Sequence, residues 1–289
     1  MEEVTGRTQV RDHQLALLPM LREIDRICDM HGLRYMLFAG TALGAARHQG
    51  FIPWDDDLDV IFLREDYERF LALAPAELGE EYFLQKEYSE HWPMFFSKLR
   101  KNNTACMETV HPRDPLQHQG IYIDIFPADA LSDHPVTARL QYLASRVVLA
   151  KCLYQRGYLT NNPAKKGFLR FCSLLPMEPF RRFAQRRGDT GSRRVHSFFG
   201  ASRRFERSVY ERRWFEETAR MPFEEGCFPV SVHYDALLKT LYGDWRKPPS
   251  DQSKAVKVHG VLVDLEHSYE QYLDWQARQH YSTYTRSIR

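Results

Sequence analysis

Apolar residues recur along the chain with two different spacings. Between residues 12 and 31 they fall three or four positions apart, which is the spacing of one face of an α-helix. Elsewhere they form short runs rich in β-branched and aromatic side chains, as in buried strands. The predicted helices cover residues 12–31, 42–47 and 66–74, the last ending at Pro75, and the predicted strands cover 34–38, 57–62, 82–84, 95–99 and 121–126. This alternation predicts an α/β fold, with helices packed on a β-sheet.

The second half of the chain has a weaker pattern. The elements predicted there are helices within 136–214 interrupted at Pro163, Pro176 and Pro179, a helix at 228–241 that ends at Gly243, and a polar, aromatic helix or tail at 269–289. Proline cannot continue a helix without loss of a backbone hydrogen bond, so it marks the expected breaks. These elements do not extend the α/β alternation of the first half.

Charge sets residues 136–214 apart from the rest of the chain. They contain 15 arginines and 3 lysines against 4 acidic residues, a net charge of +14, whereas the whole chain carries +2. This asymmetry suggests an anionic partner, although a solvated helical face would give the same count. Phenylalanine and leucine interleave with arginine at 168–187, which favours a surface that meets anionic lipid headgroups or a lipid-linked glycan. No recognised binding motif accompanies the arginines, so nucleic acid is not the expected partner.

Composition narrows the class of protein. The chain has 289 residues, 43% of them hydrophobic, with a mean hydropathy of −0.52. No apolar run approaches the roughly 20 residues that span a bilayer, and the N-terminus shows no secretory apolar region. The five cysteines are scattered without CxxC spacing, which argues against a zinc ribbon or a disulfide framework. We therefore expect a cytoplasmic protein, with peripheral contact at the inner face of the membrane through 136–215 as one interpretation.

Two aspartates at the start of a predicted strand are the first candidates for chemistry. Asp57 and Asp59 lie two positions apart, so in an extended chain both carboxylates point to the same face. Such a pair is best accommodated by a hard divalent cation, Mg²⁺ or Mn²⁺. The alternative is a solvated acidic loop. The neighbouring Asp55 and Asp56 are expected only to support this pair, for example by binding turn amides.

A candidate phosphate site precedes these aspartates. Gly40 and Thr41 follow a predicted strand and open a predicted helix, where free backbone N–H groups and the helix dipole attract anions. Thr41 is expected to cap the helix or to donate to a phosphate oxygen. Arg47 and His48 could add phosphate contacts, because arginine offers a bidentate fork, or they could be a surface charge pair.

Two further charged residues interrupt apolar strands. Asp124 lies within Ile-Tyr-Ile-Asp-Ile-Phe, and a buried carboxylate needs either a partner or a wet cleft. It could be a third metal ligand, a general base for an incoming hydroxyl, or the partner of a core arginine. Lys98 alternates with apolar neighbours on another predicted strand, which is consistent with a phosphate-facing position.

These motifs together resemble those of a known family. Gly40-Thr41 followed by Asp57-x-Asp59 is similar to the signature of the nucleotidyltransferase-fold superfamily, and GTALGAARHQGFIPWDDDLDV resembles the LicD/fukutin family of phosphotransferases. Two distal segments also fit, GIYIDIFP at 120–127 and LYGDW at 241–245 with His259 beyond it. The resemblance implies a nucleotidyltransferase-like mixed β-sheet with packed helices, and a role for His259 in contacting nucleotide or substrate. It divides the chain into a catalytic core at 1–135, a basic helical insertion at 136–215 and a C-terminal part at 216–289 that completes the catalytic domain.

The resemblance also implies a reaction. It would be transfer of a phosphorylated head group, phosphocholine or an alditol phosphate, from a CDP-linked donor to a sugar hydroxyl of a cell-surface or lipid-linked glycan, with release of CMP. The same residues would equally serve a nucleotidyltransferase that acts on a nucleoside triphosphate and releases pyrophosphate. A non-catalytic glycan or lipid-surface binding protein is a third alternative, but such a protein would have no need to retain Asp57, Asp59 and Asp124.

Overall fold

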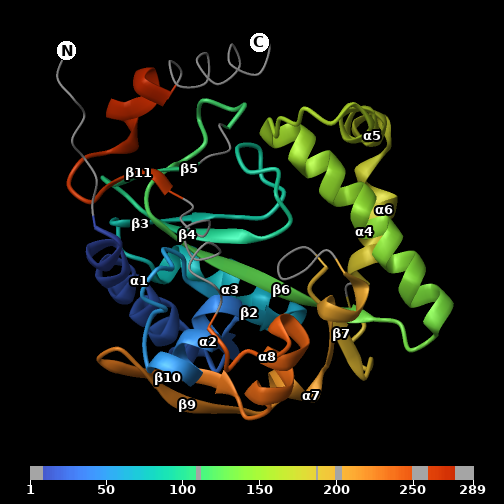
Figure 1. Cartoon of the computed structure of the whole chain (residues 1–289), viewed down its shortest axis with the longest axis horizontal. Helices are drawn as coiled ribbons and strands as arrows, with labels where there is room; N and C mark the ends of the chain where they lie inside the picture. The colour runs from blue at the N-terminus through green and yellow to red at the C-terminus, as the bar shows by residue number, and fades with distance from the viewer. Residues whose placement is uncertain (1–8, 109–111, 187, 199–203, 249–259, 277–289) are drawn as a thin grey trace.

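The fold is built around one mixed sheet of seven strands (Figure 1). The computed structural model describes residues 9–108, 112–186, 188–198, 204–248 and 260–276. The order across the sheet is β1-β2-β6-β4-β3, with β7 paired to β6 and β8 to β7. The strands are β1 Tyr35–Leu37, β2 Asp59–Leu63, β3 Tyr82–Gln85, β4 Ser97–Lys101, β6 Tyr122–Leu131, β7 Arg194–His196 and β8 Val209–Glu211. β2 and β6 run parallel, whereas the β1–β2, β3–β4, β4–β6, β6–β7 and β7–β8 pairs are antiparallel. The α/β prediction is confirmed.

Both faces of this sheet are covered. Along β2 the apolar side chains alternate, so that Val60 and Phe62 enter one core cluster and Ile61 and Leu63 enter another. The helices that surround the sheet are α1 Val10–His31, α2 Ala39–His48, α3 Arg64–Glu77, α7 Arg213–Glu216 and α8 Tyr234–Tyr242. A strand buried on both faces reads as a continuous apolar run, which is why β2 was visible in the sequence.

Two antiparallel strand pairs and two short 3₁₀ turns complete this part of the structure. The pairs are β9 Thr218–Phe223 with β10 Gly226–Ser231, and β5 Ala105–Glu108 with β11 Gly260–Asp264; the turns are Phe205–Ser208 and Tyr269–Tyr272. The β5–β11 pair joins residues more than 150 positions apart in the chain. It holds the C-terminal segment against β5.

The basic insertion forms three helices beside the sheet (Figure 1). They are α4 Pro135–Arg156, α5 Pro163–Leu174 and α6 Met177–Gln185. Pro163 is the first residue of α5, where its missing N–H costs nothing, and Pro176 precedes α6. Pro179 lies in the first turn of α6 and does not break it. The prediction of helices throughout 136–214 was wrong after α6, because β7 pairs with β6 and β8 pairs with β7, so this part of the span belongs to the sheet.

Several predicted boundaries were wrong. The strand predicted at 57–62 begins only at Asp59, so Asp57 lies in the segment before it and the two carboxylates do not share one strand face by alternation. The helix predicted to end at Pro75 continues to Glu77, and it ends with the Leu78 N–H donating to the Ala74 carbonyl. The predicted helix at 228–241 begins only at Tyr234, because residues up to Ser231 form β10 opposite β9. The apolar residues of β10 could not be distinguished from the start of a helix by apolar content alone. The helix does end at Gly243, which has a positive φ of 76°.

Candidate active site

Three charged residues form a row across neighbouring strands. Asp59 at the start of β2 lies in register with Asp124 of β6. Lys98 of β4 lies in register with Asp124 from the other side. In-register residues on adjacent strands project from the same face with their side chains within reach of each other. The fold therefore brings together residues that are separated by up to 65 positions in the sequence.

Negative charge converges at the start of β2. Burial raises the pKa of Asp59 well above its usual range, and the charges of Asp57, Asp124 and Asp55 raise it further, while Lys98 opposes them. Asp57 lies in the segment that leads into the strand. Carboxylates held together in this way repel one another, so a bound cation would stabilise the arrangement.

The N-terminus of α2 lies against the same carboxylates. A Cβ atom at Gly40 would approach Asp55 Oδ2 to 2.8 Å and Asp57 Oδ1 to 3.9 Å, so only glycine allows this close packing. Thr41 is buried, and its Oγ1 accepts a hydrogen bond of 2.8 Å from the Asp59 backbone N–H. Its side chain does not cap the helix, whose N-cap position is Phe38. Thr41 thus fixes the backbone of a candidate metal ligand.

Lys98 lies beside Asp124 in a nearly closed environment. Its Nζ is 2.9 Å from Asp124 Oδ1 and 3.7 Å from Glu108 Oε1. The ammonium group also lies 3.1 Å from the centre of the Tyr122 ring. Burial lowers the pKa of Lys98, and the Asp124 and Glu108 carboxylates oppose this effect. In this structure Lys98 is the counter-ion of Asp124, and its predicted contact with phosphate stays a prediction.

Glu108 and Arg156 lie beside these residues, although no sequence motif pointed to either of them. Glu108 ends β5, and one of its carboxylate oxygens accepts a hydrogen bond from Arg156 at the end of α4. The other oxygen accepts a 3.1 Å bond from the Tyr122 hydroxyl. Burial would raise the pKa of Glu108, but the positive charges of Arg156, Lys98 and Arg100 hold it well below its usual range. A row of opposite charges therefore links the basic insertion to Asp124.

Arg47 and His48 lie at the opposite end of α2 from Gly40 and Thr41. Six positions separate Thr41 from Arg47, which corresponds to about 9 Å along a helix. Arg47 Nη1 donates to the Trp245 carbonyl at 3.0 Å, and its Nε donates to His48 Nε2 at 3.0 Å. Burial lowers the pKa of Arg47, and burial with the charge of Arg47 lowers that of His48. In this structure both residues contact each other or the C-terminal motif, so their role at a phosphate stays a prediction.

The C-terminal motif at 241–245 approaches the site through α8. Burial raises the pKa of Tyr242 well above its usual range, and the charges of Asp59, Asp57 and Asp55 raise it further, so its hydroxyl lies in the field of those carboxylates. Tyr242 was not among the residues that we predicted for the site. His259 lies outside the described residues.

Binding of Mg²⁺ or Mn²⁺ by Asp57 and Asp59 stays a prediction. Among the described residues no three His, Cys, Asp or Glu side chains form a group that could hold a metal. Two carboxylates are nevertheless compatible with Mg²⁺, because phosphoryl-transfer enzymes usually hold it by one or two carboxylates together with substrate phosphates. Asp56 has a different contact, because its Oδ2 accepts the Gly260 N–H at 3.1 Å and so attaches β11 to this loop.

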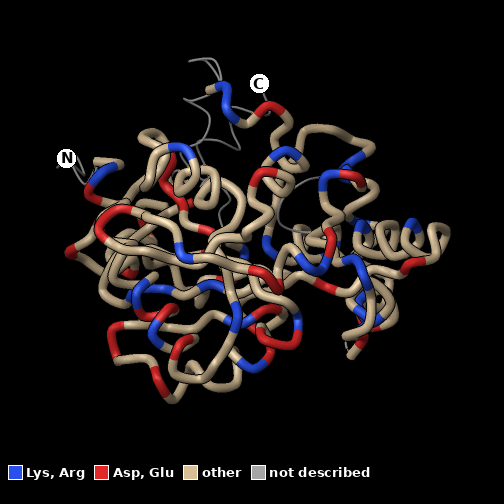
Figure 2. The backbone as a smooth tube through the Cα atoms, turned by 90° about the horizontal axis from the view of Figure 1, so that it is seen from below, with Lys and Arg blue, Asp and Glu red and all other residues tan. Residues whose placement is uncertain are grey.

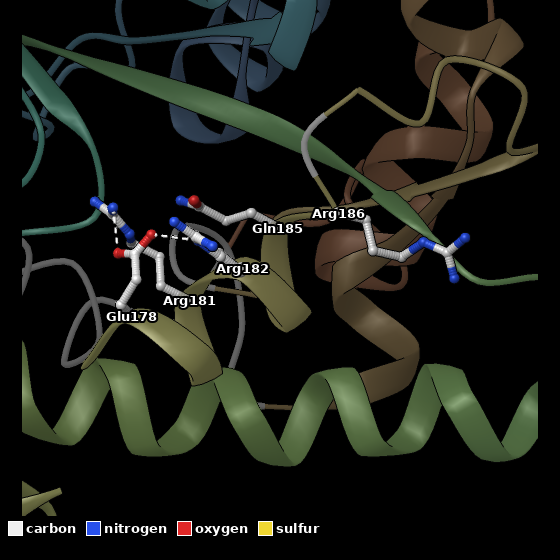
Figure 3. Close-up of a pocket in the computed structure, with 5 residues that line it drawn as sticks. All are labelled: Glu178, Arg181, Arg182, Gln185 and Arg186. Carbon is white, nitrogen blue, oxygen red and sulfur yellow. Dashed lines mark hydrogen bonds and ion pairs between the residues drawn. The ribbon is translucent and has the colours of Figure 1, made fainter. Parts of the chain in front are cut away.

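A separate hollow of about 420 Å³ lies along α6 (Figure 3). It is lined by Glu178, Arg181, Arg182, Gln185 and Arg186. Its positive charges are largely paired, since Glu178 accepts hydrogen bonds from two of the arginines and Arg186 lies 2.7 Å from Asp189. None of the predicted site residues lines it.

Comparison with known proteins shows a match between part of this chain and a known domain family. Residues 32–147 match the LicD/FKTN/FKRP nucleotidyltransferase domain. The chain is 26% identical to lipopolysaccharide cholinephosphotransferase LicD of Haemophilus influenzae over 267 residues, which covers 88% of this chain and 98% of that protein.

Two shorter matches accompany it. An uncharacterised protein of Rickettsia prowazekii is 32% identical over 122 residues, 42% of this chain and 41% of that protein. Ribitol 5-phosphate transferase FKRP of Mus musculus is 33% identical over 101 residues, 28% of this chain and 20% of that protein. The matched domain contains Asp57, Asp59, Lys98, Glu108 and Asp124. Residues 32–147 therefore match the LicD/FKTN/FKRP nucleotidyltransferase domain, and the chain is similar over most of its length to a LicD protein.

Proposed function

We propose that this protein transfers a phosphorylated head group, phosphocholine or an alditol phosphate, from a CDP-linked donor to a sugar hydroxyl of a cell-surface glycan or its precursor, releasing CMP. The observation that carries the proposal is the cluster of carboxylates at the N-terminus of α2, where Gly40 packs against Asp55 and Asp57 and their charges act on Asp59. The relatives named as cholinephosphotransferase and ribitol 5-phosphate transferase support both head groups.

The residues at the start of β2 would bind the donor. Asp57 and Asp59 would hold Mg²⁺ or Mn²⁺, which when bound would neutralise charge on the pyrophosphate and on the departing CMP. The first backbone N–H groups of α2 lack partners within the helix and carry the positive end of its dipole, so they favour phosphate oxygens. Positioning and charge stabilisation of this kind supply most of the rate enhancement in phosphoryl transfer.

Asp124 would act on the acceptor. Its carboxylate is adjacent to Asp59 across the sheet and is held by the Lys98 ammonium at 2.9 Å, which fixes its orientation. A fixed carboxylate within hydrogen-bond reach of the acceptor hydroxyl can remove its proton as the new bond to phosphorus forms. Ligation of a second cation is the other role open to it.

The test is Mg²⁺-dependent release of CMP from a panel that includes CDP-choline and CDP-ribitol. Asp57→Asn and Asp59→Asn should each lower the rate by at least about 100-fold, because each removes charge stabilisation from the reacting phosphate. Asp12→Asn, at an exposed position on α1, is the matched control and should keep the wild-type rate. CMP formation that survives in both site variants would refute the assignment of these residues.

A nucleotidyltransferase is the second candidate, because the matched domain carries that name. It would attack the α-phosphorus of a nucleoside triphosphate and release pyrophosphate through the same ligands. Pyrophosphate from CTP or ATP, with no CMP from any CDP-linked donor, would select this alternative.

A further inference from the structure

The basic insertion carries several apolar side chains that are exposed to solvent. Its exposed apolar side chains on the outer side of two helices, here called the outer surface, are Val136, Leu140 and Leu143 of α4 and Phe168, Phe171 and Leu174 of α5. Phe171 is 60% exposed and Leu174 is 81% exposed. Single exposed apolar residues are common, but six on two adjacent helices form a patch of the kind that marks an interaction site.

The spacing of these residues explains how they remain exposed. On α4, positions 136, 140 and 143 follow the helical period, and the same face continues through Ala150, which is covered by Leu169 and Cys172 of α5. Thus α5 covers only the C-terminal part of this face. α5 itself presents a second apolar stripe at 168, 171 and 174, each three positions apart, on the side away from its buried residues.

Basic side chains lie next to the outer surface, on helices that are basic as a group. Helices α4, α5 and α6 contain nine Lys and Arg residues and one acidic residue, Glu178. Lys166 and Arg170 are exposed and lie one turn apart on α5, next to the apolar stripe. Figure 2 shows the distribution of charged residues along the backbone. In the described part of the chain, no helix is long and apolar enough to cross a membrane.

We propose that the outer surface docks on the face of an anionic lipid bilayer. Its apolar side chains would enter the boundary between headgroups and acyl chains, while Lys166 and Arg170 would contact lipid phosphates. The charge favours lipid over a second copy of this chain, because a symmetric contact would place two strongly basic surfaces opposite each other. The proposal does not depend on the transferase assignment.

The position of α4 gives this docking a consequence for the site. Its last residue, Arg156, is bonded to Glu108, which lies next to Lys98 and Asp124. The membrane-facing insertion and the candidate active site therefore share one continuous chain of contacts. A glycan carried on a lipid would be presented at the surface on which the protein rests.

The experiment is flotation of the full-length protein with vesicles, with no nucleotide or acceptor present. Vesicles of phosphatidylcholine alone are compared with vesicles in which about 30% of the lipid is the anionic phosphatidylglycerol. Variant F168S/F171S removes apolar contacts, and variant K166Q/R170Q removes two charges. Variant M30S/V261S changes two apolar residues that are exposed elsewhere and is the matched control.

Wild type should bind the anionic vesicles and lose binding as salt is added. K166Q/R170Q should bind about 30-fold more weakly, from the contribution of each basic residue near a charged surface. F168S/F171S should bind at least about tenfold more weakly, and M30S/V261S should bind as wild type does. Circular dichroism and thermal melting of each variant show whether it remains folded.

Three results would overturn the proposal. These are failure of folded wild type to float with anionic vesicles, equal binding by wild type and both outer-surface variants, and a wild-type dimer in solution that F168S/F171S abolishes without any vesicle binding. Because vesicle binding is read without substrate, its failure is separate from failure of the transfer reaction.

Discussion

Replacing Thr41 by valine tests how the candidate metal site is held. Valine has nearly the same shape as threonine but lacks the hydroxyl that accepts the Asp59 backbone N–H at 2.8 Å. The sequence alone suggested that this hydroxyl contacts phosphate or caps α2, whereas the structure uses it to position Asp59. The two roles give different results when the hydroxyl is removed.

The size of the effect follows from burial. Thr41 is 3% exposed and Asp59 is 8% exposed, so water cannot readily replace the lost bond. An N–H group left buried without an acceptor costs about 1–3 kcal/mol, which should appear as reduced free energy of unfolding. Loss of a group that orients a metal ligand typically weakens metal binding by about 10–100-fold. We expect both effects in Thr41→Val.

The assay combines urea unfolding with CMP release measured across Mg²⁺ and donor concentrations. The positioning role predicts a higher Mg²⁺ requirement, a lower kcat at fixed Mg²⁺ and an unchanged KM for the donor at saturating Mg²⁺. Thr41→Ser keeps the hydroxyl and should keep the wild-type Mg²⁺ requirement, although its lost methyl group costs about 1 kcal/mol of stability. A variant Thr41→Val with wild-type stability and Mg²⁺ dependence but a raised donor KM would refute the positioning role.

Two further predictions concern buried charge on β6 and its neighbours. Arg64→Met should lower the free energy of unfolding, measured in urea, by about 3–5 kcal/mol. The Arg64 guanidinium lies 2.6 Å from Asp129 and 2.7 Å from Glu87, so the variant leaves two buried carboxylates without their cation. A loss below about 1 kcal/mol would contradict this. Burial lowers the pKa of His196 to about 4 from its ordinary 6.5, so the unfolded chain binds a proton that the folded chain rejects between these values. The stability that this residue contributes is complete above pH 6.5 and falls as the pH drops towards 4, and His196→Gln should flatten that slope by roughly 3 kcal/mol across the window. Parallel pH profiles for wild type and His196→Gln would show that the histidine does not titrate on unfolding.

Local pattern was enough to predict the central strands and the charged residues that they carry. The apolar run after Asp59 and the one around Asp124 could be recognised because strands buried on both faces are continuously apolar. Gly40 was recognisable because a close approach of backbone to other groups requires glycine. The register that aligns Asp59 with Asp124 follows from strand pairing, which the pattern of a single sequence does not specify.

The other residues of the candidate site are brought together by contacts between segments that are distant in the sequence. Glu108 and Arg156 are 48 positions apart, and nothing in the sequence around either residue indicates that they meet beside Lys98. Tyr242 lies in the segment recognised at 241–245, but local pattern did not show that α8 brings it close to the carboxylates. Boundaries such as the one at Pro75 failed for a smaller reason, since an exposed last turn tolerates a proline.

The length of β6 has a consequence for which parts of this protein can be exchanged. Its first half carries Asp124 between β2 and β4, and its second half, from Asp129 to Leu131, is paired with β7 after the insertion helices. The strand β6 therefore pairs both with the strands of the candidate active site and with the strand that follows the insertion helices. Excising residues 136–215 would strip β6 of a neighbour and leave an open edge prone to aggregation. Sequence changes are therefore expected to be tolerated within helices α4 to α6, provided that the chain enters and leaves this span at the same places. Chimaeras that exchange specificity between relatives should be joined inside the span.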